Sequence, residues 1–478
     1  MEERKGFGSN FGFLMAAIGS AVGLGNIWGF PNKMGANGGF TFLILYLVLA
    51  VFCGVIVMIG ELALGRKTGH GAIGAYRILS KKFKWLGWLG IAAAALIFSF
   101  YSALGGYCLR YVVVNFGNLI GAEFGTNGVG GADVFQGLLS QPDVSIAFAL
   151  AFMFITMLVV MSGVGGGIER VCSVGMPALF FILIICIIRS CTLPGAADGL
   201  KYMFVPGWAV ANGIIDEAPG FWRVLTAAGG QMFFSLSLGA GVMITYGSYL
   251  DKKQDLGKST MIIVGMDTVV ALMAGLCVIP GRFALDPNGA LGGPELLFIT
   301  MQNVFDKMGP AGPVFGILFY LLVFFAAISS SISMLEVIVA HFCDKAREKG
   351  KGDRRKLYSA IAVVICAALC ALVCADGMGS NHISPAELLG LAGAKLPGWS
   401  TSWLGLFDSV AEGLLMPLGA LLMCLMISWE LKPDTLRQEI LLNGENRPWV
   451  YDFFRLCVKY ITPLCMLMIL YGQISDFF

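Results

Sequence analysis

Long apolar stretches separated by short polar gaps run through the whole chain. Crossing a bilayer as a helix takes about 20 residues, and eleven stretches reach that length. They must be helices, because an open strand would leave backbone groups unpaired in lipid, and the alternation of an outer-membrane barrel is absent. The pattern predicts an all-α integral membrane protein with eleven transmembrane helices, at residues 10–35, 39–65, 86–120, 144–162, 171–192, 222–250, 259–284, 312–342, 356–375, 404–430 and 449–474.

Composition agrees with this pattern. The chain of 478 residues is 57% hydrophobic and only 13% charged, whereas soluble domains carry about 25% charged residues. The net charge of +2 is spread over loops between spans, so we expect no nucleic-acid partner. The 13 cysteines lie mostly within apolar stretches and lack metal-binding spacing, so we interpret them as small core residues.

Lysine and arginine concentrate in alternate gaps. They fill residues 66–84 and 345–356, and the gap 121–143 has none. By the positive-inside rule the N-terminus is cytoplasmic, and an odd number of spans places the C-terminus outside. We therefore expect a multi-pass protein of the cell (inner) membrane. The outer loop 285–311 holds a short helical pattern at 294–306, which we expect to lie across the outer mouth.

Spans one and six are interrupted near their middles, at Gly19–Asn26 and at Phe234–Gly241. Glycines are costly inside a helix, and a lone GxxxG would instead be a close helix-packing motif. Two interruptions five spans apart favour a transporter site, because unwound backbone can bind ions and carboxylates. They predict a single transporter domain over 1–478, with one repeat at 1–192, an inverted repeat at 222–430 and an additional helix at 449–474.

These interruptions lie within motifs that span nearly the whole chain. The chain closely resembles the neurotransmitter:sodium symporter family (solute carrier family 6), of the bacterial leucine-transporter type. The motifs are GSAVGLGNIWGFP from Gly19, NGG from Asn37, GELALGR from Gly60, FYS from Phe100, LPGA from Leu193, QMFFSLSLG from Gln231 and AAISSS from Ala326. The resemblance implies a sodium-coupled symporter that imports an amino acid by alternating access.

The resemblance implies two sodium sites made of oxygen ligands, as a hard cation requires. The first would use the carbonyl of Ala21 and the side chains of Asn26, Ser235 and Asp267. The second would use the carbonyls of Gly19, Val22 and Ala326 and the hydroxyls of Ser329 and Ser330. Serine pairs in membrane helices also commonly bond their own backbone.

The resemblance also implies a central substrate site. The substrate carboxylate would meet the amides of Leu24 and Gly25 and the Tyr101 hydroxyl, and its side chain would face Ile97, Phe234, Ser237, Ala240, Ser330 and Met334. Ala21, Gly23 and Ser235 would complete a substrate site of twelve residues. Relatives that carry monoamines have an aspartate where this chain has Gly23, so Gly23 favours an amino acid. Ala240 replaces a large aromatic residue of the leucine transporter. This favours a neutral hydrophobic or aromatic substrate, unless Met334 fills the space.

Three of the acids within predicted spans are expected to be buried: Glu61, Asp267 and Glu336. Asp267 would cost about 2.5–3.5 kcal/mol to insert, so it is either functional or bonded to a neighbouring helix. Chloride-dependent relatives have asparagine there and a serine one turn later, where this chain has Ala271. We therefore expect chloride not to be required. Glu61 and Glu336 are expected to accept N–H groups of unwound backbone.

The resemblance implies two gates. At the cytoplasmic side Arg4 would pair with Asp344 beside Ser248 and Tyr249, with Phe7 as a plug; Arg4 could instead be only a topology charge. At the outer side the family pairs an arginine with an aspartate, but this chain has Gly29 and keeps Asp408. Three explanations stay open: aromatic closure by Tyr101 and Phe234 alone, another cation, or a cationic or larger substrate that meets Asp408.

Other functions are weaker hypotheses. The chain could carry an amine or a cationic amino-acid derivative, or it could be a membrane sensor that binds its ligand without moving it. An enzyme is not expected, because none of the three histidines is paired with a Cys, Ser or acid at catalytic spacing. The glycines of 163–167 lack the Lys-Ser/Thr that a phosphate-binding loop needs.

Overall fold

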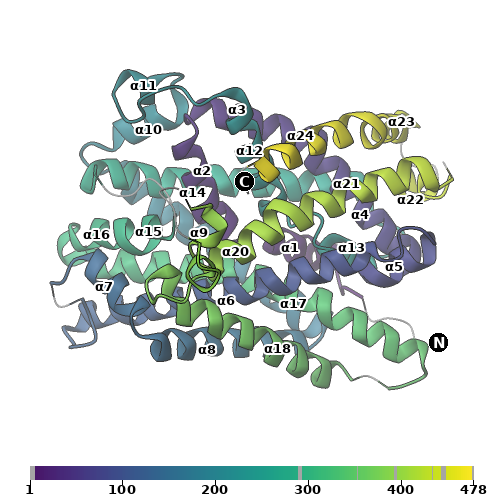
Figure 1. The fold of residues 1–478 in the computed structure, drawn as a ribbon, viewed down its shortest axis with the longest axis horizontal. Helices are drawn as coiled ribbons and strands as arrows, with labels where there is room; N and C mark the ends of the chain where they lie inside the picture. The colour runs from purple at the N-terminus through teal and green to yellow at the C-terminus, as the bar shows by residue number, and fades with distance from the viewer. Residues whose placement is uncertain are drawn as a thin grey trace.

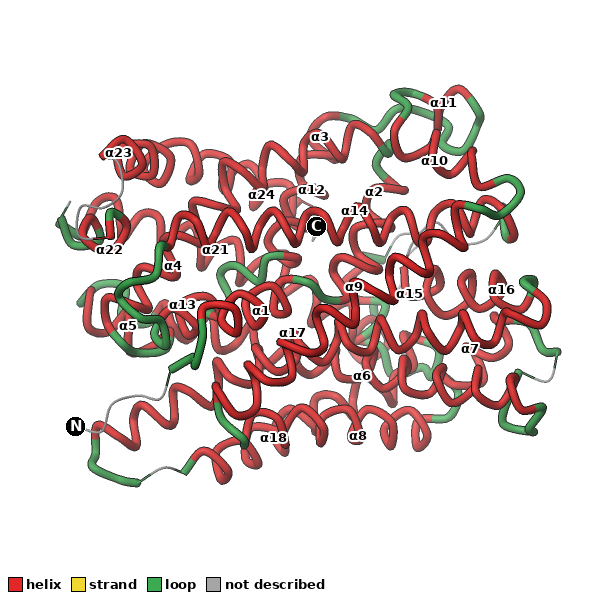
Figure 2. The backbone as a smooth tube through the Cα atoms, turned by 180° about the vertical axis from the view of Figure 1, so that it is seen from behind, coloured by secondary structure: helices red, strands yellow, loops and turns green. Residues whose placement is uncertain are grey.

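The computed structural model describes residues 6–126, 128–288, 293–352, 354–391, 396–432, 434–442 and 448–475. In these residues every regular element is a helix, and loops join the helices (Figure 2). Nine helices of this part of the chain are apolar and long enough to cross a membrane. They are Phe40–Thr68, Leu86–Ile120, Pro142–Met161, Val164–Cys191, Leu256–Leu285, Gly309–Glu348, Arg355–Gly379, Trp403–Glu430 and Pro448–Ser475.

Two further regions correspond to the predicted broken spans. α1 (Asn10–Ala21) is followed by η1 (Gly25–Gly29) and α2 (Phe30–Ala36), with a bend of 46° at the break, and together they count as a tenth crossing. α12 (Phe221–Ser235) and α13 (Val242–Gly247) are each too short to cross alone. The predicted count of eleven therefore depends on α12 and α13 crossing as one interrupted span, and it stays a prediction.

Several crossings contain a π-helical turn, which is wider than an α-helical one, between two α-helical parts. These turns are η2 (Ala50–Gly54), η8 (Ser409–Leu415) and η11 (Cys457–Ile461). The crossings consist of α3 (Phe40–Leu49), η2 (Ala50–Gly54) and α4 (Val55–Thr68); α6 (Leu86–Ile120); α8 (Pro142–Met161); η3 (Val164–Glu169) and α9 (Arg170–Cys191); α14 (Leu256–Leu285); α17 (Gly312–Glu348); α18 (Arg355–Asp376); α20 (Trp403–Asp408), η8 (Ser409–Leu415), α21 (Met416–Leu425) and η9 (Met426–Glu430); and α23 (Pro448–Leu456), η11 (Cys457–Ile461) and α24 (Thr462–Ser475).

Short helices connect the crossings and gather at the two ends of the bundle. Figure 1 shows α5 and α22 at one end, near the start of α1, and α7, α10, α11, α15 and α16 at the other. The short elements are α5 (Ala72–Leu79), α7 (Gly131–Leu139), α10 (Ala196–Phe204), α11 (Trp208–Ala211), α15 (Gly293–Glu295), η4 (Leu296–Thr300), α16 (Met301–Asp306), η5 (Gly309–Ala311), η6 (Gly377–Gly379), α19 (Pro385–Leu388), η7 (Gly398–Ser400) and α22 (Arg437–Ile440). The helix predicted at 294–306 is present as α15, η4 and α16.

Local chemistry sets where the key helices begin and end. Ser9 caps α1 by accepting the Gly12 N–H at 2.9 Å, and Asp255 caps α14 by accepting the Lys258 N–H at 3.0 Å. α4 ends at Gly69, whose φ of 64° is the left-handed conformation that glycine adopts without strain. Through the middle of the bundle α17 packs against α6, α9 and α1. The break in α1 therefore lies in the protein interior, where irregular backbone is tolerated in a membrane.

Candidate functional site

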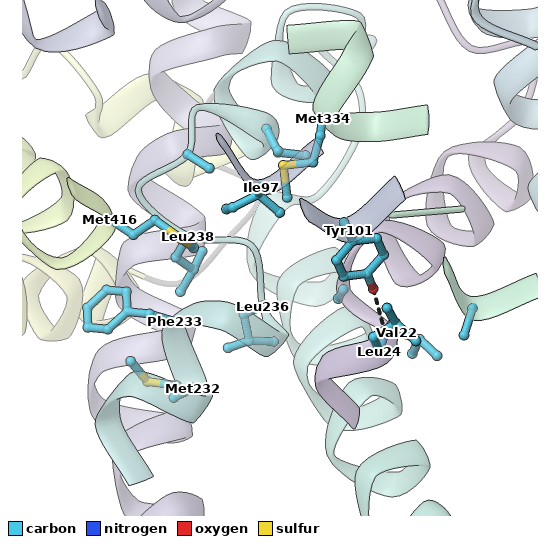
Figure 3. Packing of buried hydrophobic residues seen from close by; sticks show 14 of the residues in the cluster. Val22, Leu24, Ile97, Tyr101, Met232, Phe233, Leu236, Leu238, Met334 and Met416 are labelled. Carbon is cyan, nitrogen blue, oxygen red and sulfur yellow. Dashed lines mark hydrogen bonds between the residues drawn. The ribbon is translucent and has the colours of Figure 1, made fainter. Parts of the chain in front are cut away.

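The break in the first crossing turns backbone amides toward side chains of other elements. Val22 ends α1 with an extended ψ of 101°. The Leu24 N–H then donates to the Tyr101 hydroxyl of α6 at 2.5 Å, shown as a dashed line in Figure 3, and the Gly23 N–H donates to Asn26 Oδ1 at 3.0 Å. These amides can be offered to a carboxylate because they are not committed to the helical backbone ladder.

The second break requires backbone conformations that favour glycine. Between α12 and α13, Ser237, Gly239 and Gly241 have φ values of 53°, 80° and 74°. A Cβ on Gly239 would also lie 2.1 Å from the Met416 carbonyl oxygen, so both φ and space demand glycine. Glu61 of α4 accepts the Gly239 N–H at 2.7 Å, as expected for an acid that supports unwound backbone.

A small cavity lies where the two breaks meet. Its volume is about 10 Å³, the space of a single water. Nine of the twelve residues predicted for substrate binding line it, and Ser20 lines it in addition. The nine are Ala21, Gly23, Gly25, Ile97, Tyr101, Phe234, Ser237, Ser330 and Met334, whereas Leu24, Ser235 and Ala240 lie outside its lining. Figure 3 shows Met334 beside Ile97 in the cavity wall. The sequence analysis had left open whether Met334 fills the space that the small Ala240 leaves.

At the cavity, hydrogen bonds connect α1, the break between α12 and α13, and α17. The Ser237 hydroxyl donates to the Ser20 carbonyl at 3.0 Å, and the Ser330 hydroxyl of α17 approaches the same carbonyl at 3.2 Å. A Cβ on Gly23 would lie 2.4 Å from both the Ser330 and the Tyr101 hydroxyl oxygens. The side of the cavity that faces Gly23 therefore has no room for a side chain in this conformation.

Four side chains meet at the predicted first sodium site. Asp267 Oδ1 accepts from Asn26 Nδ2 at 2.7 Å, and Asp267 Oδ2 accepts from the Ser235 hydroxyl at 2.9 Å and from the Tyr46 hydroxyl at 3.2 Å. All four residues are at most 1% exposed. A fixed carboxylate with amide and hydroxyl oxygens in a dry site is a suitable set of ligands for a hard cation. The structure thus brings Asn26, Ser235 and Asp267 together.

The residues of the predicted second sodium site lie along the contact between α1 and α17. Ser330 Oγ is 3.3 Å from the Gly19 carbonyl oxygen, and Ser329 donates to the Ala326 carbonyl at 3.0 Å. A Cβ on Gly19 would lie only 3.1 Å from Ser329 Cβ, so the close approach depends on glycine. Gly19, Val22, Ala326, Ser329 and Ser330 are all buried. Ser329 also donates to the Phe325 carbonyl of its own helix, which was the alternative noted for such pairs, whereas Ser330 donates to carbonyls of α1.

The predicted inner gate combines an aromatic cluster with a buried ion pair. Phe7 packs edge-on against Tyr246 and Tyr249, with ring centroids 5.6 and 6.1 Å apart. The Tyr249 hydroxyl donates to Glu336 at 2.5 Å, and Arg355 donates to both oxygens of the same carboxylate, at 2.5 and 3.1 Å. The expectation that Glu336 accepts backbone N–H groups is therefore wrong, because side chains hold it.

Asp344 and Ser248, also predicted for the inner gate, contact residues outside the predicted gate. Asp344 accepts the Gly71 N–H at 2.9 Å and forms an ion pair with Arg347, and the Ser248 hydroxyl donates to the Thr245 carbonyl at 2.5 Å. Arg4 lies outside the described residues. Asp344 thus fixes the start of α5 as well as standing where a gating acid was predicted.

At the side predicted to face outward, an ion pair lies one helical turn beyond the predicted gate. Lys33 and Glu412 form it, and their side chains are 27% and 10% exposed. They are four residues beyond Gly29 and Asp408 respectively, and the Asp408 carboxyl lies close to both Glu412 and Lys33. The group borders a hollow of about 750 Å³. The space beside Gly29 is taken by Gln231, whose Oε1 would be 2.8 Å from a Cβ at Gly29.

Comparisons with known proteins agree with this geometry. The sequence profile described as Sodium:neurotransmitter symporter family matches residues 4–127 and 132–386. The chain belongs to this family. The transporter is 36% identical over 477 residues to the uncharacterized sodium-dependent transporter YhdH of Bacillus subtilis (strain 168), covering 98% of this chain and 97% of the relative.

The chain is also similar to a solved structure and to a more distant relative. The transporter is similar to MhsT, whose crystal structure in complex with L-phenylalanine superposes with a TM-score of 0.84 at 33% identity and covers 98% of this chain and 100% of MhsT. It is 26% identical over 372 residues to the sodium- and chloride-dependent GABA transporter ine of Drosophila melanogaster, across 70% of this chain and 38% of that relative. The transporter is therefore a sodium-dependent, multi-pass membrane transporter.

Several residues of the transporter's site were missed by sequence reasoning. They are Ser20 in the cavity wall, Tyr46 and Gln231 beside the first break, Lys33 and Glu412 at the outer side, and Arg355 behind the inner gate. One signal was available for the outer pair. Lys33 and Glu412 each follow a recognised gate position by four residues, the spacing of neighbours on one helix face.

Proposed function

We propose that the chain imports a neutral, hydrophobic or aromatic amino acid together with sodium by alternating access. The main support is that the cavity where the two broken helices meet is lined by Ile97, Phe234 and Met334 and has no acid at Gly23. An amine that lacks a carboxylate would find no fixed anion there. MhsT, which is 33% identical to this chain, has a crystal structure in complex with L-phenylalanine.

The substrate carboxylate would bind backbone N–H groups and a sodium ion. We expect this carboxylate to take over the Leu24 N–H that now donates to the Tyr101 hydroxyl, so that Tyr101 turns its own O–H toward the carboxylate. The carboxylate would also face a sodium ion held by the Ala21 carbonyl, Asn26, Ser235 and Asp267. A second ion would lie between α1 and α17, at Gly19, Val22, Ala326, Ser329 and Ser330. Chloride is not required in this proposal, because Asp267 provides the fixed negative charge.

The closed state of the site supports alternating access. A cavity of about 10 Å³ cannot hold an amino acid, so we expect the elements that line it to separate when the substrate enters. Sodium would favour the conformation that binds it more tightly, since a ligand shifts an equilibrium only by its differential affinity. The ions thereby couple the sodium gradient to substrate entry.

Uptake into proteoliposomes tests the proposal. The twenty amino acids and several indole amines would compete with labelled phenylalanine, with and without an inward sodium gradient. We expect hydrophobic and aromatic amino acids to compete and uptake to need sodium. Binding without accumulation would indicate a sensor, and competition by amines in place of amino acids would reject the substrate assignment.

Gly23 gives a steric prediction. Gly23→Ala places a methyl group where 2.4 Å separates the built Cβ from two hydroxyl oxygens. Overpacking of this kind costs about 1–3 kcal/mol, so substrate affinity should fall about 5- to 150-fold. Gly175→Ala is the matched control, because nothing lies within 4 Å of a Cβ there. Equal affinities of the two variants in a binding assay would contradict the proposed pocket.

The outer ion pair gives a charge-swap prediction. We propose that Lys33 and Glu412 close the outer route in place of a pair at Gly29 and Asp408. Lys33→Glu should lower uptake at least tenfold, since three acids would then face one another. Combining it with Glu412→Lys should restore much of the rate. Lys201→Glu changes the exposed outer pair with Asp198 and should leave uptake unaltered. A double variant as slow as Lys33→Glu would reject the pair as a gate.

A further inference from the structure

A hollow away from the transport route is lined by cations and tryptophans. Its volume is about 290 Å³, and it lies among α5, the beginning of α6 and the end of α17. Arg77, Lys84 and Lys345 provide its charge, Trp85, Trp88 and His341 its rings, and Ile73 contributes an apolar wall. None of these functions in the proposed transport cycle.

The charges of this hollow are not balanced within it. Three of the described residues that line it are cations, and none is an acid. Arg77 pairs with Glu348, which also lies 3.6 Å from His70 Nε2. Lys81 and Lys82, just before Lys84, are exposed and add to the positive field. The hollow therefore offers a site for a group with at least one negative charge.

The aromatic residues indicate where in the membrane this site lies. Trp85 and Trp88 are 47% and 53% exposed at the beginning of a crossing. Tryptophan at that position marks the boundary between headgroups and hydrocarbon. Clusters of basic residues next to a crossing bind anionic lipid headgroups. A soluble anion would gain from the lysines alone, whereas a lipid would also cover the exposed rings.

We infer that this hollow binds the phosphate headgroup of an anionic phospholipid from the leaflet on that side, with its chains against Trp85 and Trp88. The phosphate would bridge α5 to α17, through Arg77 and Lys345. Asp344, next to Lys345, already accepts the Gly71 N–H at the start of α5. Bound lipid would add a second link between the same two elements. Lipid binding at this hollow does not depend on the identity of the transported substrate.

Lipid titration of the purified full chain in detergent tests the inference. Dioleoyl phosphatidylglycerol, dioleoyl phosphatidylcholine and inorganic phosphate would be titrated separately, with bound molecules counted by native mass spectrometry. Each basic side chain near an anionic headgroup is worth somewhat less than tenfold in affinity, so Lys84→Gln with Lys345→Gln should weaken phosphatidylglycerol binding about 30-fold. Unfolding temperatures in lipid-free detergent would show that the variants fold.

The matched control removes two other basic residues from the same side. Lys252→Gln with Lys258→Gln makes the same change in net charge at positions outside the hollow, and it should change binding less than threefold. Equal weakening in both double variants would mean diffuse surface attraction and overturn the site. Phosphatidylcholine that binds as tightly as phosphatidylglycerol would also overturn it, and inorganic phosphate of equal affinity would assign the hollow to a soluble anion and overturn the lipid site.

Discussion

Asp267→Asn is expected to abolish sodium-driven uptake in chloride-free medium. The Asp267 carboxylate is fully buried and receives hydrogen bonds from Asn26, Ser235 and Tyr46. We expect a sodium ion to replace the donor contacts of Asn26 and Ser235, so that the carboxylate balances the ion's charge. Losing one partner of a buried charge pair costs about 3–5 kcal/mol, at least a hundredfold in sodium affinity.

The measurement is uptake of radiolabelled sodium and phenylalanine into proteoliposomes with gluconate in place of chloride. Asp198→Asn, an exposed acid of the outer face, is the control and should retain uptake. Combining Asp267→Asn with Ala271→Ser should make uptake depend on chloride, because this pair of residue types is the one that chloride-dependent relatives show. Unchanged uptake by Asp267→Asn without chloride would remove the argument that this carboxylate replaces the anion.

The broken helices could be predicted because their cause is local. Gly239 and Gly241 have φ values of 80° and 74°, and these left-handed conformations favour glycine. The outer helix at 294–306 was predictable for a similar reason, since it follows Gly293-Pro294 and keeps a helical pattern. In both cases the sequence within a few residues contains the physical reason for the structure.

The outer ion pair could not be predicted in the same way. Lys33 and Glu412 are 379 positions apart, and in the sequence Lys33 is one more charge near the end of a span. Their meeting depends on the tertiary arrangement that brings α2 and η8 together at this ion pair. The partner of Glu336 could not be predicted from the sequence for the same reason. The sequence showed a buried acid, but its cation, Arg355, looked like one of many charges in a basic loop.

Arg355→Ala is expected to destabilise the protein by about 3–5 kcal/mol, since it leaves the Glu336 carboxylate buried without its cation. Glu336 is 0% and Arg355 14% exposed at their side chains, and the guanidinium contacts both carboxylate oxygens. Thermal unfolding in detergent measures the loss. Arg437→Ala is the control, because its pair with Asp434 is exposed, with side chains 52% and 82% accessible. Such surface pairs contribute about 0–1 kcal/mol.

A second variant separates buried charge from packing. Arg355→Met with Glu336→Gln removes both charges and keeps similar volumes, so most of the lost stability should return. The amide introduced in this variant could still accept the Tyr249 hydroxyl, which joins α17 to the segment after α13 beside Phe7. If the double variant is as unstable as Arg355→Ala, the arginine acts by packing against α8 and not by neutralising Glu336. The double variant could instead be stable and transport, while reagents added on the cytoplasmic side label its inner gate. That result would mean that the full charge on Glu336 holds Tyr249 in the closed gate.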